Sequence, residues 1–260
     1  MSAPFSSGAP APARAAWLFD QPYAHRGLWR PGGAPENSMA AFAAAAAAGL
    51  GCELDVRVSA DDEAVIFHDG GLKRMTGVDA RVSSLSATDL GKIALTGSSE
   101  TIPRLSDLLD AYPDMALLVE MKTTPGGEGP LEARTAALLR DREGPTAVMS
   151  FNPATLAVFA ALAPHIARGQ LTTGFKIGPS GAPAGALPAD DPGGADVSAP
   201  DFLSCNIDAL EAYGAPAAAR MGLALVTWTV RTPANLALAQ RFARGVIFES
   251  LPVESVRAAR

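Results

Sequence analysis

Short apolar runs alternate with longer segments of helical periodicity along most of the chain. Nine runs have the length and composition of strands: Tyr23–Gly27, Gly51–Val58, Ala64–His68, Met115–Lys122, Ala147–Phe151, Ile166–Leu171, Phe202–Asn206, Ala224–Val230 and Gly245–Glu249. Segments with helical patterns follow most of them: Ser38–Ala48, Arg104–Tyr112, Leu131–Arg142, Pro153–Leu162, Asp208–Met221 and Pro233–Phe242. Alternation of this kind predicts parallel strands that are joined by crossover helices.

Nine strands are one too many for a closed eight-stranded barrel, and the spacing of the second and third runs explains the excess. Only a few polar residues separate Val58 from Ala64, whereas parallel neighbours need a connection of about a dozen residues or more. We therefore expect an antiparallel hairpin, which places His68 beside Glu53 and Asp55. The other eight runs predict an α/β fold, a (β/α)8 TIM barrel with a short insertion between the second strand and the second helix.

The domain organisation follows from this pattern. Residues 1–20 are expected to form a flexible N-terminal lead, because the Ala/Pro/Ser-rich start lacks the regions of a signal peptide. Residues 21–260 are expected to form a single barrel domain, with the insertion at about residues 56–103. A second irregular stretch, Gly174–Pro200, is rich in Gly and Pro. Because it follows a barrel strand, we expect it to lie on the catalytic face and to serve substrate handling.

Composition narrows the classes of protein that the chain can belong to. Hydrophobic residues make up 48% of its 260 residues, which is ample for a core. A net charge of −6 argues against binding to nucleic acid or to an anionic membrane surface. No apolar run reaches the length of about 18 residues that a transmembrane segment needs. Cys52 and Cys205 lie in apolar runs, so we expect buried reduced thiols in a cytoplasmic protein.

Charged residues interrupt two of the apolar strands near their ends. Glu53 and Asp55 are two positions apart and therefore share one face of a strand, and Glu120 and Lys122 repeat this arrangement. Charged residues at the carboxyl ends of barrel strands are typical of catalytic sites. Three carboxylates with no cysteine nearby favour a hard divalent cation, Mg²⁺ or Ca²⁺. Lys122 beside such an ion favours an anionic substrate, and phosphate is the natural candidate.

Two histidines end predicted strands. His25 is followed by Arg26, and His68 is followed by Asp69. Two imidazoles near one cation can supply a general base and a general acid near neutral pH, and an adjacent guanidinium can bind phosphate oxygens through two parallel hydrogen bonds. The basic pair Lys73-Arg74 is interpreted as solvated.

Seven short motifs follow one another in order along the chain. They are His25-Arg26-Gly27, Pro35-Glu36-Asn37-Ser38, Glu53-Leu54-Asp55-Val56, Phe67-His68-Asp69, Ile102-Pro103-Arg104-Leu105, Val119-Glu120-Met121-Lys122 and Trp228-Thr229-Val230. In this order they resemble the glycerophosphodiester phosphodiesterase family, over about residues 23–250. An ordered set of motifs is far more specific than any single one of them.

The resemblance implies a role for each matching residue. It implies one divalent cation, Mg²⁺ or Ca²⁺, held by Glu53, Asp55 and Glu120. It implies acid and base roles for His25 and His68, without saying which is which. It implies a substrate-binding set in which Arg26 and Lys122 hold the phosphate, Glu36 and Asn37 position Arg26, and Trp228 lies near the substrate cleft.

The activity implied by the resemblance is hydrolysis of a glycerophosphodiester, a small-molecule substrate, to sn-glycerol 3-phosphate and an alcohol. Three departures from the family pattern leave the alcohol open. Arg231 stands where Asn is usual, Phe248-Glu249-Ser250 replaces the usual acidic end of the last strand, and the insertion lacks the aromatic pair that many members carry there. Two alternatives remain. One is a lysophospholipase D-like or sphingolipid head-group phosphodiesterase on the same barrel. The other is a non-catalytic phosphodiester-binding module.

Overall fold

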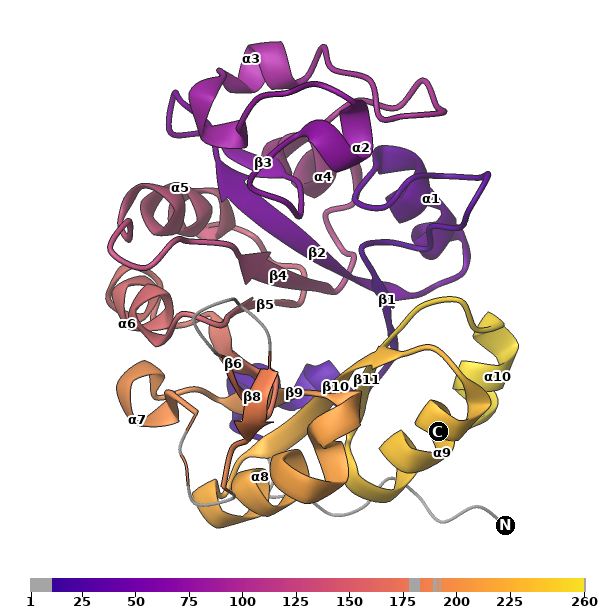
Figure 1. The fold of residues 1–260 in the computed structure, drawn as a ribbon, viewed down its shortest axis with the longest axis vertical. Helices are drawn as coiled ribbons and strands as arrows, with labels where there is room; N and C mark the ends of the chain where they lie inside the picture. The colour runs from indigo at the N-terminus through magenta and orange to yellow at the C-terminus, as the bar shows by residue number, and fades with distance from the viewer. Residues whose placement is uncertain (1–10, 178–182, 189–190, 192, 260) are drawn as a thin grey trace.

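The computed structural model describes residues 11–177, 183–188, 191 and 193–259. Within these residues, parallel strands close into a barrel (Figure 1). In order around the barrel they are β1 (Tyr23–His25), β2 (Gly51–Val58), β4 (Leu117–Met121), β5 (Thr146–Ser150), β6 (Ala167–Thr172), β9 (Phe202–Asn206), β10 (Ala224–Val230) and β11 (Gly245–Phe248). Strand β1 pairs in parallel with both β2 and β11, which closes the ring. The predicted (β/α)8 barrel is confirmed.

Helices return the chain between the strands and form the outer layer. They are α1 (Met39–Ala47), α4 (Leu105–Ala111), α5 (Pro130–Leu139), α6 (Pro153–Leu162), α8 (Ala215–Met221), α9 (Pro233–Phe242) and α10 (Val253–Ala258). Helix α1 begins where the Ser38 hydroxyl accepts a hydrogen bond from the amide of Ala41. The single helix predicted over Asp208–Met221 is instead divided into η3 (Ile207–Ala209), η4 (Leu210–Gly214) and α8. Pro216 has no amide hydrogen to donate, so a regular helix cannot run through this segment.

Between β2 and α4 the chain leaves the barrel and returns. Strand β3 (Ala64–Ile66) pairs antiparallel with β2, as the hairpin prediction requires, with Val56 opposite Ile66. It is followed by α2 (Lys73–Thr76), η2 (Val82–Ser84) and α3 (Ala87–Leu90). This segment gathers at the top of Figure 1 beside β2 and has an apolar cluster of its own.

The N-terminal segment differs from the expected flexible lead. Residues 1–10 lie outside the described residues, but Ala13–Phe19 forms a 3-10 helix, η1. Its Ala15 and Leu18 are fully buried among side chains of the barrel strands, including Tyr23. The prediction of a flexible lead through residue 20 is therefore wrong for η1, because its apolar face covers apolar side chains of the barrel interior.

The stretch Gly174–Pro200 also contains regular structure. Strands β7 (Phe175–Ile177) and β8 (Pro183–Ala186) form an antiparallel pair, and α7 (Ala195–Ser198) follows. Residues 178–182, 189–190 and 192 lie outside the described residues. The stretch follows the carboxyl end of β6, which is the catalytic face of such a barrel. The described part is a hairpin and a helical turn, so the expectation of a wholly irregular stretch is wrong.

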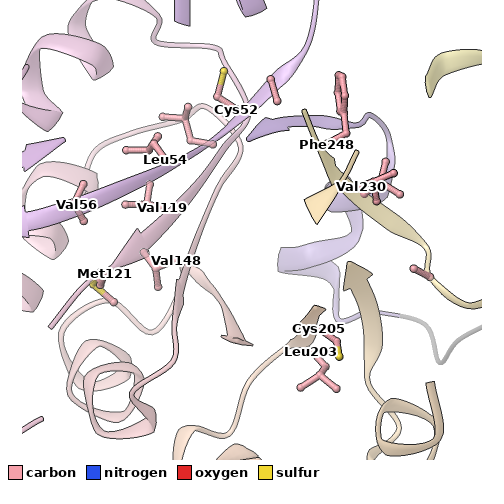
Figure 2. Packing of buried hydrophobic residues seen from close by; sticks show 14 of the residues in the cluster. Cys52, Leu54, Val56, Val119, Met121, Val148, Leu203, Cys205, Val230 and Phe248 are labelled. Atoms are coloured by element: carbon pink, nitrogen blue, oxygen red, sulfur yellow. The ribbon is translucent and has the colours of Figure 1, made fainter. Parts of the chain in front are cut away.

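Two apolar clusters divide the strand side chains between the two faces of the barrel. Leu54 and Val56 of β2, with Val119 and Met121 of β4, belong to a cluster that includes helix residues (Figure 2). Leu118 belongs to a second cluster, built from strand residues and η1. Since successive side chains of a strand point to opposite faces, the charged residues between the first set lie inside the barrel.

The prediction of two buried thiols is confirmed. Cys52 and Cys205 are buried and unbridged, and burial raises the pKa of the Cys205 thiol to about 12. Among the described residues, every helix falls short of the length and apolar character that a bilayer crossing requires.

Candidate active site

Three carboxylates meet inside the mouth of the barrel. The parallel register places Asp55 of β2 opposite Glu120 of β4, and Glu53 lies two residues before Asp55 on the same face. One oxygen from each residue lies within 4.8 Å of the others, and all three side chains are buried. The spacing that the sequence predicted therefore brings the three acids together.

The electrostatics of this carboxylate cluster favour a bound cation. Burial raises the pKa of Glu53 well above its usual value, and the charges of Asp55 and Glu120 raise it further. Burial also raises the pKa of Glu120 to about 7. For Asp55, Lys122 and Arg26 outweigh burial and lower the pKa. The donor set, all hard oxygen, fits a divalent ion such as Mg²⁺ or Ca²⁺.

Two buried carboxylate oxygens of the cluster also suit a bound divalent ion. Asp55 Oδ1 and Glu120 Oε1 are buried and accept no hydrogen bond of good geometry from the described residues. Their ionic contact is with Lys122 Nζ, which lies 3.1 Å from Asp55 Oδ1 and 2.6 Å from Glu120 Oε1. Buried polar atoms normally have such partners, so these two oxygens are suited to coordinate a metal.

Arg26 reaches the cluster from the loop after β1. Its backbone has a positive φ of 59°, and its amide donates a hydrogen bond to Glu53 Oε2 at 3.1 Å. The guanidinium lies between two acids, with Nη1 2.9 Å from Glu36 Oε1 and Nε 3.2 Å from Asp55 Oδ2. Arg26 is thus held at the edge of the carboxylate cluster, where a phosphate oxygen can reach it.

Of Glu36 and Asn37, which were both expected to position Arg26, only Glu36 contacts its side chain. Glu36 holds Arg26, as the resemblance implied. Asn37 instead donates from Nδ2 to Asp55 Oδ2 at 2.8 Å, so it positions a carboxylate of the cluster. Arg74, which was interpreted as solvated, has a side chain that is 47% exposed, and its guanidinium also donates to Glu36 Oε1 at 2.7 Å.

His25 is oriented by a residue that sequence reasoning did not assign to the site. Its Nδ1 lies 2.6 Å from Glu249 Oε2, and its Nε2 faces the cluster, 3.9 Å from Glu53 Oε2. Burial would raise the pKa of Glu249, but hydrogen bonds from His25 and Arg231 lower it to about 2. Glu249 is therefore ionised, and it holds the proton of a neutral His25 on Nδ1. An acid directly after the last barrel strand was the available signal.

His68 has a similar partner of its own. Its Nδ1 lies 2.6 Å from Asp69 Oδ1, and Arg74 Nε donates to the other oxygen of Asp69 at 2.5 Å. The amide of Phe67 donates to the carbonyl of Asp55 at 3.0 Å, which brings the end of the hairpin to the carboxylate cluster. Burial lowers the pKa of His68, although the charge of Asp55 opposes this. Both histidines thus direct Nε2 away from their carboxylate partners.

An open cavity of about 450 Å³ adjoins Glu120 and Lys122. Phe151, which is 41% exposed, lines it, and its ring stacks edge-on against Trp228 with centroids 5.6 Å apart. Trp228 Nε1 donates to the carbonyl of Ser204 at 3.2 Å. An aromatic pair therefore lies beside the charged site, with Phe151 at the cavity and Trp228 packed against it.

The arrangement suits chemistry on a phosphodiester. Cations at Arg26 and Lys122 can bind nonbridging oxygens, and a metal in the carboxylate cluster would add positive charge at the same place. Two imidazoles, each with one nitrogen held by a carboxylate, can move protons at the other nitrogen.

Comparison with known proteins identifies related families and folds. The model of the family described as "Glycerophosphoryl diester phosphodiesterase family" matches residues 25–251. Over 89 residues the chain is 43% identical to Probable glycerophosphodiester phosphodiesterase 2 of Mycobacterium tuberculosis, covering 34% of this chain and 33% of that protein. Over 100 residues it is 33% identical to a human lysophospholipase D, covering 34% of this chain and 32% of that protein. The chain thus spans about a third of the length of these two curated relatives.

Solved structures match over nearly the whole chain. A phosphodiesterase from Oleispira antarctica, solved with the product sn-glycerol-3-phosphate, superposes with a TM-score of 0.76 at 25% identity. The match covers 92% of this chain and 96% of that one. A protein from Silicibacter pomeroyi superposes with a TM-score of 0.75 at 23% identity, covering 92% of both chains.

Proposed function

Because the chain belongs to the glycerophosphoryl diester phosphodiesterase family, we propose that it is a metal-dependent hydrolase of glycerophosphodiesters that releases sn-glycerol 3-phosphate and an alcohol. The observation that carries this proposal is the buried cluster of Glu53, Asp55 and Glu120, which lies beside two cations and two carboxylate-held histidines. The product bound in the Oleispira antarctica relative supports the glycerol phosphate half of the substrate.

The proposed cation is Mg²⁺ or Ca²⁺, held by the three carboxylates. When bound, it supplies positive charge to the nonbridging phosphate oxygens and favours ionisation of the attacking hydroxyl. Arg26 and Lys122 bind the same phosphate and stabilise the charge that develops in the transition state. Asn37 keeps Asp55 oriented, and Glu36 keeps Arg26 at the edge of the cluster.

The proton transfers are assigned to Nε2 of His25 and of His68. A neutral ring whose Nδ1 proton is held by a carboxylate has a free lone pair on Nε2, and the protonated ring can donate from the same atom. One histidine takes the proton from the nucleophile, which is water or the glycerol 2-hydroxyl. The other gives a proton to the departing alkoxide as its bond to phosphorus breaks. If the 2-hydroxyl attacks, water then opens the cyclic phosphate.

A second candidate has one specific observation in its favour. Phe151 is exposed beside the catalytic cavity and packs on Trp228, so an apolar group has a surface on which to lie. A lysophospholipase D activity would use this surface for the lipid part of its substrate, and a human relative has that name.

One assay separates these functions. Purified protein is given glycerophosphocholine, glycerophosphoethanolamine or lysophosphatidylcholine, each with Mg²⁺, Ca²⁺ or a chelator. We expect glycerol 3-phosphate from the two water-soluble diesters, and none with the chelator. Turnover of lysophosphatidylcholine alone would favour the second candidate. Binding without turnover of any diester would favour a phosphodiester-binding module.

A further inference from the structure

A second, smaller cavity lies on the other side of Lys122, between the insertion and the loop after β4. Its volume is about 180 Å³, several times the roughly 30 Å³ that one water occupies in the liquid. Three residues with cationic side chains are among those that line it: Arg57, Arg81 and Lys122. No Asp or Glu is among the described residues that line it. This composition is typical of a site for an anion.

Two guanidinium groups converge over Gly70. Arg57 Nη1 and Arg81 Nη2 lie 3.7 and 3.8 Å from the position that a Cβ on Gly70 would occupy. Because Gly70 has no side chain, the space between the two groups stays open. Burial lowers the pKa of Arg57, and the charge of Arg81 also lowers it. The two like charges therefore repel each other, and an anion between them would offset the repulsion and accept hydrogen bonds from both.

Backbone carbonyls hold the guanidinium of Arg57 in place. Arg57 Nε donates to the carbonyl of His68 at 2.8 Å, and Nη1 donates to the carbonyl of Lys122 at 3.3 Å. The main chain of Arg81 forms an antiparallel bridge with Gly71, and the residue is exposed. No acidic side chain among the described residues forms an ion pair with Arg81, whereas Arg74 of the same insertion pairs with two acids. Arg81 is therefore available to a ligand.

The small cavity and the catalytic cavity share part of their lining. Arg57, Lys122, Thr123 and Thr124 line both. On the catalytic side Lys122 contacts Glu120, and on the other side it borders the space below Arg81. A substrate whose phosphate is bound by Lys122 can therefore extend an adjoining group toward Gly70.

We propose that the cavity over Gly70 is a second anion subsite, which recognises a phosphate carried by the alcohol portion of the substrate. Arg81 is its specificity-determining residue. The inference rests on the proposed function, because it concerns which glycerophosphodiesters the enzyme prefers. The favoured substrate class is then a diester whose alcohol carries a further phosphate, such as glycerophosphoglycerol phosphate.

The test compares two substrates that differ by one phosphate. These are glycerophosphoglycerol and its terminally phosphorylated form, and kcat/KM is measured for each at saturating divalent cation. We expect the wild-type protein to favour the phosphorylated diester about tenfold, which is the scale of one charge-assisted hydrogen bond. Arg81→Gln should abolish this preference through KM while leaving kcat/KM for glycerophosphoglycerol within about twofold of wild type. Arg81→Lys should retain part of the preference, and added salt should weaken it.

The control is Arg140→Gln, which removes the same charge from an exposed side chain at the carboxyl end of α5. That end of a barrel helix lies on the face opposite the catalytic mouth. An equal loss of preference in this variant would overturn the subsite, because it would show a general field effect. An absent preference in wild type, or one unchanged by Arg81→Gln, would overturn it too. If neither diester is cleaved, the proposed function itself fails and the inference falls with it.

Discussion

At the scale of single residues, Glu249 determines the state of His25. One oxygen of its carboxylate lies within hydrogen-bond distance of His25 Nδ1, and the other accepts a hydrogen bond from Arg231 Nε. The two residues that depart from the family pattern, Arg231 and Glu249, therefore act together. Arg231 binds the Glu249 carboxylate, and that carboxylate binds the His25 imidazole. This pair acts through His25, so we regard both residues as positioning residues.

Replacing the acid tests this role. Glu249→Gln keeps the shape but can donate an amide hydrogen to Nδ1, which would favour the tautomer with the proton on Nε2. We expect kcat to fall about 10²-fold or more with little change in KM, since loss of the correct tautomer has large effects in comparable acid–histidine pairs. Arg231→Gln is the matched control, and we expect it to lose less than about tenfold. A wild-type kcat and pH profile in Glu249→Gln would contradict the assignment.

The acid and base roles of the two histidines can be distinguished by changing the leaving group of the substrate. His25→Ala and His68→Ala should each lose about 10²–10⁴-fold in kcat, the range of positioned proton transfer. A nitrophenyl phosphodiester needs no protonation of its departing oxygen, so it should selectively rescue the variant that lacks the general acid. The losses should not add in the double variant. Near wild-type turnover of a natural diester by either single variant would exclude the two-histidine mechanism.

At the scale of elements, the turn from β6 into β7 depends on a glycine. Gly174 has a φ of 72°, and a Cβ there would lie 2.2 Å from the Cβ of Ala209. Phe175 and Leu187, on either side of the hairpin, pack against the apolar cluster outside the barrel. The base of this hairpin therefore packs against the core, although the stretch is rich in Gly and Pro.

Two glycine-to-alanine substitutions distinguish the cost of backbone strain from the cost of overpacking a side chain. Gly222 ends α8 with a similar φ of 67°, and no described atom lies within 4 Å of its missing Cβ. We expect Gly222→Ala to cost about 1 kcal/mol in free energy of unfolding from backbone strain alone. Gly174→Ala should cost about 2–5 kcal/mol, because overpacking adds to the strain. Urea unfolding of both variants measures the difference, and equal midpoints would show that the hairpin base is not tightly packed.

At the scale of the whole molecule, the carboxylate cluster opposes stability unless a cation is bound. The pKa of Glu120 is raised to about 7 and that of Glu53 is also raised. Between the ordinary carboxyl value of 4.5 and about 7, these two carboxyls therefore bind more protons in the folded protein than in the unfolded chain, whereas His25 and His68, whose pKa values are lowered, bind fewer. The contribution of Glu53 and Glu120 to the stability of the metal-free protein should therefore fall as pH rises through this window.

Thermal unfolding at about pH 5 and about pH 7, with chelator or with divalent cation, tests this balance. We expect the cation to raise Tm, and to raise it more at the higher pH, because binding to the folded state alone is stabilising. Glu120→Gln should weaken both the pH dependence and the gain in Tm. A Tm that does not respond to Mg²⁺ or Ca²⁺ would count against the metal site.

Removing the metal should stop turnover without unfolding the barrel. The carboxylate cluster lies at the mouth, whereas η1 and the apolar strand residues occupy a separate cluster. We expect a chelator to abolish activity while the circular dichroism spectrum keeps its folded form. Glu53→Gln and Asp55→Asn should each weaken cation binding. Either variant with unchanged affinity and activity would break the three-carboxylate assignment.

The sequence by itself determined the barrel and the core of its site. Strand positions follow from apolar runs, and the alternation of side chains along a strand is a local property. It places Glu53 with Asp55, and Glu120 with Lys122, on one face each before any fold is known. The short turn after Val58 likewise required a hairpin, which delivered His68.

Only the tertiary structure decided the contacts between distant segments. Barrel closure brings β11 beside β1, so Glu249 meets His25 across 224 positions of sequence. The convergence of Arg57 and Arg81 depends in the same way on the path of the insertion. The local sequence pattern does not predict such contacts, because they depend on the order and register of the strands and on the path of the loops in three dimensions.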